Sequence, residues 1–167
     1  NIDSQKTLSM ENASLNFPVE NIPIYIGTQG ENILKLSTSI ANGALFNTAN
    51  INDLLIAHQQ VQTSLSSSKI PSDEFDFSAQ VCVSVDSNLD KAKEAVLPPV
   101  AFIVGGASTE FLQSHNIDLK TSESIRNSIQ QGQFKQAFNQ VNSNMINEFS
   151  ICGTPDTVYE RLSEIYE

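Results

Sequence analysis

Short apolar runs along the chain alternate with longer segments in which apolar residues return every three or four positions. The runs at 22–26, 44–46, 77–85 and 148–152 predict strands, and the segments that follow them predict helices. The first run is apolar throughout, which predicts a strand buried on both faces of a sheet. Strands that alternate with helices are typical of βαβ units and a parallel sheet. We therefore predict an α/β fold of about four strand–helix units.

Capping and breaking residues set the limits of the predicted helices. Asn50 or Asn52 can cap the second predicted helix, and Thr154 is a good N-cap for the closing helix. The proline pair at 98–99 predicts an interruption of the third helix, the glycine pair at 105–106 predicts a loop, and Gly132 predicts a break between two later helices. The apolar positions of the first, second and closing helices are Ile33, Leu36 and Ile40; Leu54, His58, Val61 and Leu65; and Val158, Leu162 and Ile165.

Length and composition favour one domain. The chain has 167 residues, of which 40% are hydrophobic, so it can bury a sizeable core. Residues 1–20 are polar and show no sustained period, which predicts a lead-in loop before a domain at 21–167. Four strand–helix units are too few for a closed eight-stranded barrel of about 250 residues, which leaves a small open sheet or half of a barrel.

Charge and hydropathy exclude several classes of partner. Nine Lys and Arg residues against nineteen Asp and Glu residues give a net charge of -10, which repels nucleic-acid backbones and anionic membranes. No apolar run approaches the roughly 20 residues that span a bilayer. Two cysteines, Cys82 and Cys152, are too few for a disulfide scaffold, and we expect both to be reduced thiols. We therefore expect a soluble, cytoplasmic protein that binds neither nucleic acid nor membrane.

The loop of Gly27, Thr28, Gln29 and Gly30 is the leading candidate for a ligand site. It follows the first predicted strand and opens the first predicted helix, so free backbone N–H groups and the helix dipole converge there. This arrangement suits a phosphate group, and the two glycines let a ligand approach the backbone closely. The same pattern also fits a simple turn, because the loop lacks the third glycine of a dinucleotide fingerprint and the Gly-Lys-Ser/Thr of a P-loop.

The other reactive residues form no catalytic constellation in the sequence. The corner at 153–156 is explained by helix capping, although strand–helix corners gather at one face of a parallel sheet and could add donors to the same ligand. His58 lies on an apolar helical stripe and His115 in a polar loop, and neither has a partner at metal-ligand spacing. Cys82 and Cys152 fall on neighbouring predicted strands as small hydrophobic residues. We predict no metal site and assign no catalytic residue.

Three stretches, taken in order, resemble the luciferase-like flavin and deazaflavin barrel enzymes. Residues 22–30 hold a proline, an apolar strand and a glycine loop; 34–45 hold a helix that ends in Ala-Asn-Gly before a strand; and 151–158 hold a Gly-Thr-Pro-Asp corner. Within that family the stretches look most similar to archaeal 5,10-methylenetetrahydromethanopterin reductases. The resemblance implies that the chain is the C-terminal half of a TIM (β/α)8 barrel, with the N-terminal half of the barrel as its partner.

The resemblance also implies an oxidoreductase that transfers a hydride between coenzyme F420, a 5-deazaflavin, and a one-carbon-carrying pterin. The loop at 27–30 would hold the phosphate or ribityl end of the coenzyme, which would carry the redox chemistry. Two residues depart from the family pattern: Asn42 replaces the usual Asp, and Glu31 places a negative charge near the supposed phosphate. Because the family's catalytic residues belong to the other half of the barrel, we expect the isolated chain to be inactive.

Two other functions stay open at this point. An FMN-dependent monooxygenase of the same fold would use a flavin in place of F420. A half-barrel without enzymatic activity would bind a ligand or pair with a second copy to close the sheet. Because an exposed sheet edge favours association, we expect a homo-oligomer.

Overall fold

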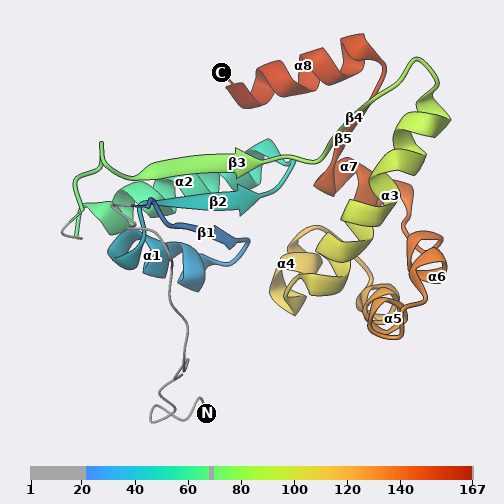
Figure 1. The fold of residues 1–167 in the computed structure, drawn as a ribbon, viewed down its shortest axis with the longest axis horizontal. Coiled ribbons are helices and arrows are strands. Elements are labelled where there is room, and N and C mark those ends of the chain that lie inside the picture. The colour runs from blue at the N-terminus through green and yellow to red at the C-terminus, as the bar shows by residue number, and fades with distance from the viewer. Residues whose placement is uncertain (1–21, 68–69, 167) are drawn as a thin grey trace, which may run out of the picture.

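The computed structural model describes residues 22–67 and 70–166, so the predicted lead-in loop at 1–20 lies outside the described residues. Strands and helices alternate along the chain, as predicted (Figure 1). The strands are β1 (Tyr25–Thr28), β2 (Gly43–Asn47), β3 (Asp76–Gln80), β4 (Val83–Val85) and β5 (Ile151–Gly153). The helices are α1 (Glu31–Ile40), α2 (Ile51–Leu65), α3 (Leu89–Gly106), α4 (Thr109–Ser114), α5 (Leu119–Gln130), α6 (Phe134–Phe138), α7 (Ser143–Phe149) and α8 (Pro155–Tyr166).

All described strand pairs are parallel, which confirms the α/β prediction. One sheet has the order β1-β2-β3, and β4 pairs with β5 in a second sheet. The single strand predicted at 77–85 is divided between β3 and β4, which are separated by Val81 and Cys82. The Ile151 backbone N–H donates to the Cys82 carbonyl at 2.8 Å. One extended segment therefore pairs first with β2 and then with β5 (Figure 1).

The two faces of the three-stranded sheet differ in composition. Ala44, Phe46 and Phe77 lie on the face that packs against α1 and α2, where they join one hydrophobic core. Because side chains alternate along a strand, the opposite face carries mostly small or polar residues. We call it the polar face; it comprises Tyr25, Gly27, Gly43, Leu45, Asn47, Asp76, Ser78 and Gln80. The outer helices therefore position a polar surface that runs to the carboxyl ends of the strands.

The prediction that the first strand is buried on both faces is wrong. β1 begins at Tyr25 rather than at 22, and its residues alternate between exposed and half-buried. Ile22 and Ile24, which precede it, are 62% and 60% exposed. The physical reason is that β1 is an edge strand of its sheet, paired only with β2 among the described residues.

The first predicted helix is confirmed as α1, but its three predicted apolar positions are not buried. Ile33, Leu36 and Ile40 are exposed, at 45%, 47% and 62%. The residues that α1 buries are Leu34, Ser37 and Thr38. Leu34 packs in the hydrophobic core that α1 shares with α2 and the sheet. The stripe of Ile33, Leu36 and Ile40 therefore faces away from both.

Helix α3 continues through the proline pair at 98–99 and includes the glycine pair at 105–106, so the predicted interruption and loop are wrong. Its buried side, which includes Val96, Val100 and Val104, packs in the core shared with α5 and α7. Burial of this surface outweighs the helix-breaking tendency of proline. Arg126 then satisfies carbonyls at the helix end, donating to the Gly105 and Ala107 oxygens at 2.6 and 3.0 Å.

The later elements follow the predictions more closely. Gly132, at φ 71, separates α5 from α6, as predicted. β5 begins at Ile151 rather than at 148, because α7 continues to Phe149. Thr154 caps α8, accepting the Thr157 N–H at 3.4 Å. Within α8 Val158 is buried, whereas Leu162 is 38% exposed.

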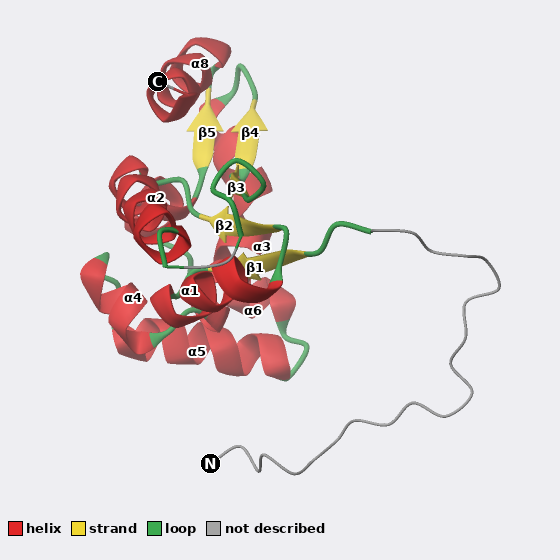
Figure 2. Ribbon diagram, turned by 90° about the vertical axis from the view of Figure 1, so that its left-hand side faces the viewer, coloured by secondary structure: helices red, strands yellow, loops and turns green. Residues whose placement is uncertain are grey.

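Helices α3 and α8 both pack against β4 and β5. In Figure 2, α8 lies beyond the carboxyl ends of these two strands, and α4 and α5 lie toward the opposite end. No helix among the described residues is both long and apolar enough to cross a membrane.

Candidate functional site

The predicted loop spans the junction between β1 and α1. Gly27 and Thr28 are the last residues of the strand, and Gly30 is the N-cap of the helix without a side-chain cap. The Thr28 hydroxyl accepts the Gly30 N–H at 3.0 Å. The four predicted residues therefore lie together at a helix N-terminus, at the carboxyl end of a parallel strand.

The fold does not require glycine at either end of this loop. A Cβ added at Gly27 or Gly30 would meet nothing within 4 Å, and neither residue has a positive φ. Gly43 and Gly153 differ, since the first lacks room for a side chain and the second has φ 158. The space above Gly27 and Gly30 is therefore open to a ligand.

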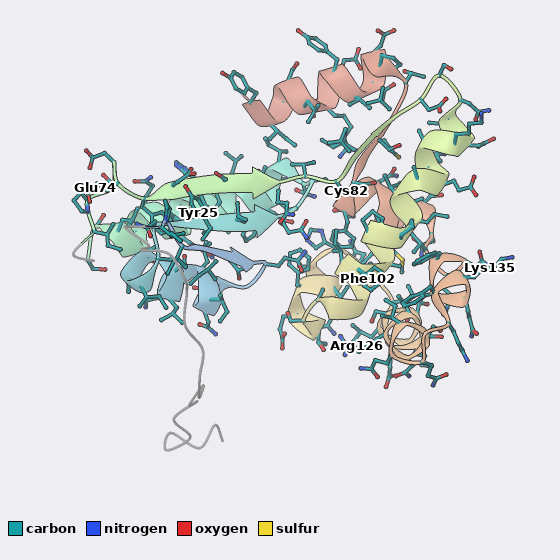
Figure 3. The ribbon with its side chains drawn as sticks, in the orientation of Figure 1. Tyr25, Glu74, Cys82, Phe102, Arg126 and Lys135 are labelled. Carbon is teal, nitrogen blue, oxygen red and sulfur yellow. The ribbon has the colours of Figure 1, made fainter. Side chains whose placement is uncertain are left out.

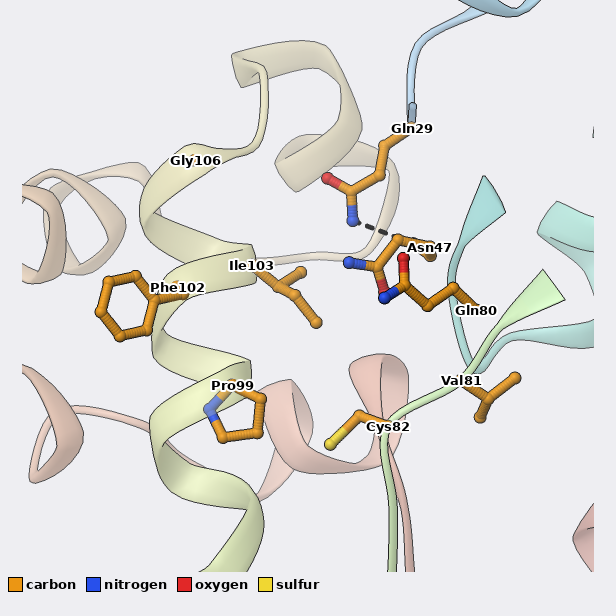
Figure 4. Close-up of a pocket in the computed structure, with 9 residues that line it drawn as sticks. All are labelled: Gln29, Asn47, Gln80, Val81, Cys82, Pro99, Phe102, Ile103 and Gly106. Atoms are coloured by element: carbon orange, nitrogen blue, oxygen red, sulfur yellow. Dashed lines mark hydrogen bonds between the residues drawn. The ribbon is translucent and has the colours of Figure 1, made fainter. Parts of the chain in front are cut away.

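The Gln29 side chain lies at a pocket of about 550 Å³ at the carboxyl ends of three strands (Figure 4). Asn47 pairs in register with Gln80, and Thr28 with Phe46, so Gln29, Asn47 and Gln80 lie at one level of the polar face. The Gln29 amide donates to the Asn47 carbonyl at 2.9 Å. Pro99, Phe102 and Ile103 of α3 form the facing wall. We call this the carboxamide pocket.

The carboxamide pocket suits a neutral ring. No charged residue is among those that line it. Carboxamides both donate and accept hydrogen bonds, and the α3 wall is apolar, so the pocket matches a flat heterocycle with donors and acceptors on its edge. Burial and the neighbouring Cys152 raise the pKa of the Cys82 thiol at the pocket wall, which keeps it protonated and a weak nucleophile.

A second hollow of about 460 Å³ lies on the other side of Gln29 and is acidic. Glu31, Asp53 and Glu110 line it, together with Gly30 and the hydroxyls of α4 and its cap. Hydrogen bonds from its own backbone N–H and from Ser108 lower the pKa of Glu110, which keeps that carboxylate ionised. Three carboxylates disfavour a phosphate in this hollow and tolerate neutral hydroxyl groups better.

Sequence reasoning missed a buried polar cluster around His115. His115 lies in the turn between α4 and α5, as predicted, but its side chain is buried, at 7% exposed. Its Nδ1 lies 2.8 Å from Glu148 Oε2, and its Nε2 lies 3.1 Å from Asp53 Oδ2. Asn50 donates to Glu148 Oε2 at 2.9 Å, and Thr48 donates to Asp53 Oδ2 at 3.0 Å.

No local pattern could have found this cluster, because its members come from three separate stretches: the start of α2 and the segment before it, the turn after α4, and α7. The only local signal was the Asn50 cap, which is confirmed: its side chain accepts the Asn52 and Asp53 N–H groups. Among the described residues no group of three or more His, Cys, Asp or Glu side chains is arranged to hold a metal. In the His115 cluster the two carboxylates lie at different ring nitrogens, so they cannot share one ion.

The remaining candidates lie apart from the carboxamide pocket or only border it. The corner at 153–156 lies where α8 begins and is not among the residues that line this pocket (Figure 2). His58 is exposed, with its ring 6.0 Å from that of Phe77. Cys82 and Cys152 lie on neighbouring extended segments, as predicted, but both are half-buried rather than buried. Cys82 borders the pocket (Figure 4).

Comparisons with known proteins agree with this fold. The chain is 39% identical to the 5,10-methylenetetrahydromethanopterin reductase of Methanopyrus kandleri over 145 residues, 87% of this chain and 42% of the relative. It is 35% identical to the enzyme of the same name from Archaeoglobus fulgidus over 157 residues, 92% of this chain and 47% of the relative. The chain thus spans less than half the length of these curated relatives.

A solved structure matches as well. The coenzyme F420 dependent tetrahydromethanopterin reductase from Methanopyrus kandleri superposes with a TM-score of 0.73 at 39% identity, covering 87% of this chain and 42% of that one. The sequence profile described as luciferase-like monooxygenase matches residues 6–167. This match, over nearly the whole chain, shows that the chain belongs to the luciferase-like monooxygenase family.

Proposed function

We propose that this chain is the C-terminal half of a TIM barrel in an oxidoreductase that transfers a hydride between coenzyme F420 and a one-carbon-carrying pterin. The observation that carries the proposal is the superposition of an F420-dependent reductase at a TM-score of 0.73 and 39% identity. The two curated relatives are methylenetetrahydromethanopterin reductases, which favours F420 over FMN.

The shape of the sheet supports the half-barrel. Its strands are parallel and follow sequence order, and α1 and α2 cover one face while the polar face is left for a barrel interior. β1 has an unpaired edge among the described residues, next to exposed Ile22 and Ile24 and the stripe of Ile33, Leu36 and Ile40 on α1. An N-terminal half-barrel would pair with this edge and cover this apolar surface.

The residues at the carboxyl end of the sheet fit a deazaflavin. Gly27, Thr28, Gln29 and Gly30 would hold its phosphate or ribityl end, since glycine is not needed there for the fold. The acidic hollow beside Gly30 favours the ribityl hydroxyls over the phosphate. The carboxamide pocket is neutral and partly apolar, as a heterocyclic ring requires. When bound, F420 supplies the hydride, and this chain positions it and excludes water.

The first test is the coding sequence upstream of Asn1. About 150 further in-frame residues with strand–helix pattern would support the half-barrel, since a complete barrel needs about 250 residues. A start codon immediately upstream would contradict it and favour a non-enzymatic binding module.

The second test measures cofactor binding by the complete protein. Fluorescence is monitored while F420 is added in one titration and FMN in another. We expect binding and turnover with F420 only. Gly30→Val should weaken F420 binding several-fold while the thermal unfolding midpoint falls only slightly, because an added Cβ meets nothing within 4 Å and valine is a weaker N-cap than glycine. Tight binding of FMN alone would support the monooxygenase instead, and unchanged F420 affinity in the variant would remove the loop from the site.

A further inference from the structure

We propose that His115 carries a proton on both ring nitrogens and thereby clamps the segment after β2 to helices α4 and α7, making it a positioning residue at the edge of the site. The protonation state of His115 is inferred from the local geometry alone. The consequence for ligand binding rests on the proposed function.

The geometry around the ring disfavours a neutral imidazole. A neutral ring has one N–H, which the 2.8 Å contact from Nδ1 to Glu148 would use. Nε2 would then present its lone pair to the anionic Asp53 Oδ2 at 3.1 Å. Nε2 is fully buried and has no hydrogen bond of good geometry, so no other group would stabilise that lone pair. A second proton converts this repulsive contact into an attractive one.

The charges around the ring lead to the same conclusion. Asp53 on α2 and Glu148 on α7 face the ring, and among the described residues His115 is the only basic group within ion-pair distance of either. Both carboxylates are partly exposed, at 19% and 27%. Phe111 of α4 and Phe149 of α7 flank the ring, with centroids at 4.6 and 5.2 Å, and aromatic neighbours favour a cation.

The clamp reaches the site through two further hydrogen bonds. Glu148 accepts from Asn50, and Asp53 accepts from Thr48. These two residues belong to the segment that directly follows Asn47, one of the carboxamides of the pocket. The ring therefore ties the position of this pocket edge to two helices that lie far away in sequence. Loss of the second proton would leave two carboxylates without a counter-charge and loosen the segment.

The direct test is an NMR spectrum that correlates the ring protons and nitrogens of the two histidines. The sequence holds only two, so exposed His58 is an internal reference. At a pH where His58 is neutral, we expect both His115 nitrogens to show the protonated chemical shift. A single unprotonated nitrogen in His115 at that pH would overturn the proposal.

Glu148→Gln removes the charge and keeps a hydrogen-bond acceptor. We expect His115 in this variant to lose its second proton at a pH where the unmodified protein keeps it. Glu164→Gln, on the exposed surface of α8, is the matched control and should leave the His115 spectrum unchanged. Equal His115 spectra in the Glu148→Gln variant and the unmodified protein would contradict the clamp.

Fluorescence titration with F420 across pH tests the positioning role. We expect the dissociation constant of the unmodified complete protein to rise several-fold as the second proton is lost, and that of Glu148→Gln to be raised at every pH. Identical pH profiles would overturn the positioning role. If neither protein bound F420 at any pH, the proposed function would fail, and the NMR result would still decide the protonation state.

Discussion

The amino and carboxyl ends of the polar face are built from similar residues but differ in how those residues are used. At the amino end Asp76 accepts from the Tyr25 hydroxyl at 2.8 Å and from the Ser78 hydroxyl at 3.0 Å, across Gly43. At the carboxyl end Gln29, Asn47 and Gln80 border a pocket of about 550 Å³. Figure 3 shows Tyr25 well away from Cys82, which borders that pocket. In parallel barrels the amino end serves stability and the carboxyl end binds ligands, so we expect the same division between the two ends of this face.

The largest expected effect on stability is at the amino end. A Cβ at Gly43 would lie 2.5 Å from both the Asp76 carbonyl and Tyr25 Cε1, so Gly43→Ala must displace backbone or ring. We expect it to lower the free energy of unfolding by about 2 kcal/mol, measured by urea denaturation. Gly106→Ala is the matched control, because its added Cβ meets nothing within 4 Å. Equal stability of the two variants would show that the sheet relaxes around Gly43.

Substitutions at the carboxyl end should reverse this pattern. We expect Gln80→Leu to change the free energy of unfolding by less than about 0.5 kcal/mol, because the side chain is exposed. The same variant should raise the F420 dissociation constant of the complete protein about tenfold, the equivalent of one hydrogen bond to the ligand. Calorimetric titration beside thermal unfolding separates the two effects. A loss of stability without a loss of affinity would contradict the assignment of this end to ligand binding.

The sequence predicts much of the fold because many of its signals are local. The Asn50 and Thr154 caps and the Gly132 break are confirmed, since each depends on residues within one turn. The errors arise where tertiary packing decides. The proline pair at 98–99 stays within α3 because the helix buries its side against α5 and α7, a surface that no local window reveals.

Prediction of the site was likewise successful for local signals and unsuccessful where tertiary packing decides. The loop at 27–30 could be found because a strand, glycines and a helix start follow one another. Asn47 and Gln80 join Gln29 only through strand register, which a single sequence does not contain. His115 meets Asp53 and Glu148 through the packing of three helices, and the polar sequence around it indicated a loop.

A more moderate effect on ligand affinity is expected at the loop 27–30, which lies between the carboxamide pocket and the acidic hollow. Gly30→Ala adds one methyl group to an open position with negative φ, so the unfolding midpoint should stay within experimental error. Affinity for F420 should fall less than in Gly30→Val, because the smaller group blocks less of the approach to the backbone. A titration series of glycine, alanine and valine at this position gives a graded response if the ligand contacts the loop. Equal affinities across the series would place the ligand elsewhere.

The smallest expected effect concerns the hydrogen bond between Tyr25 and Asp76, which is exposed to solvent. The hydrogen bond to Asp76, helped by desolvation and by the negative charge, raises the pKa of Tyr25 above its usual value of about 10. The bond therefore contributes fully below that value and is lost as pH rises through the higher folded-state pKa. In Asp76→Asn the tyrosine should ionise at lower pH, measured by tyrosinate absorbance. Tyr25→Phe should then remove this titration and leave the F420 affinity of the complete protein unchanged, since Tyr25 does not line the carboxamide pocket.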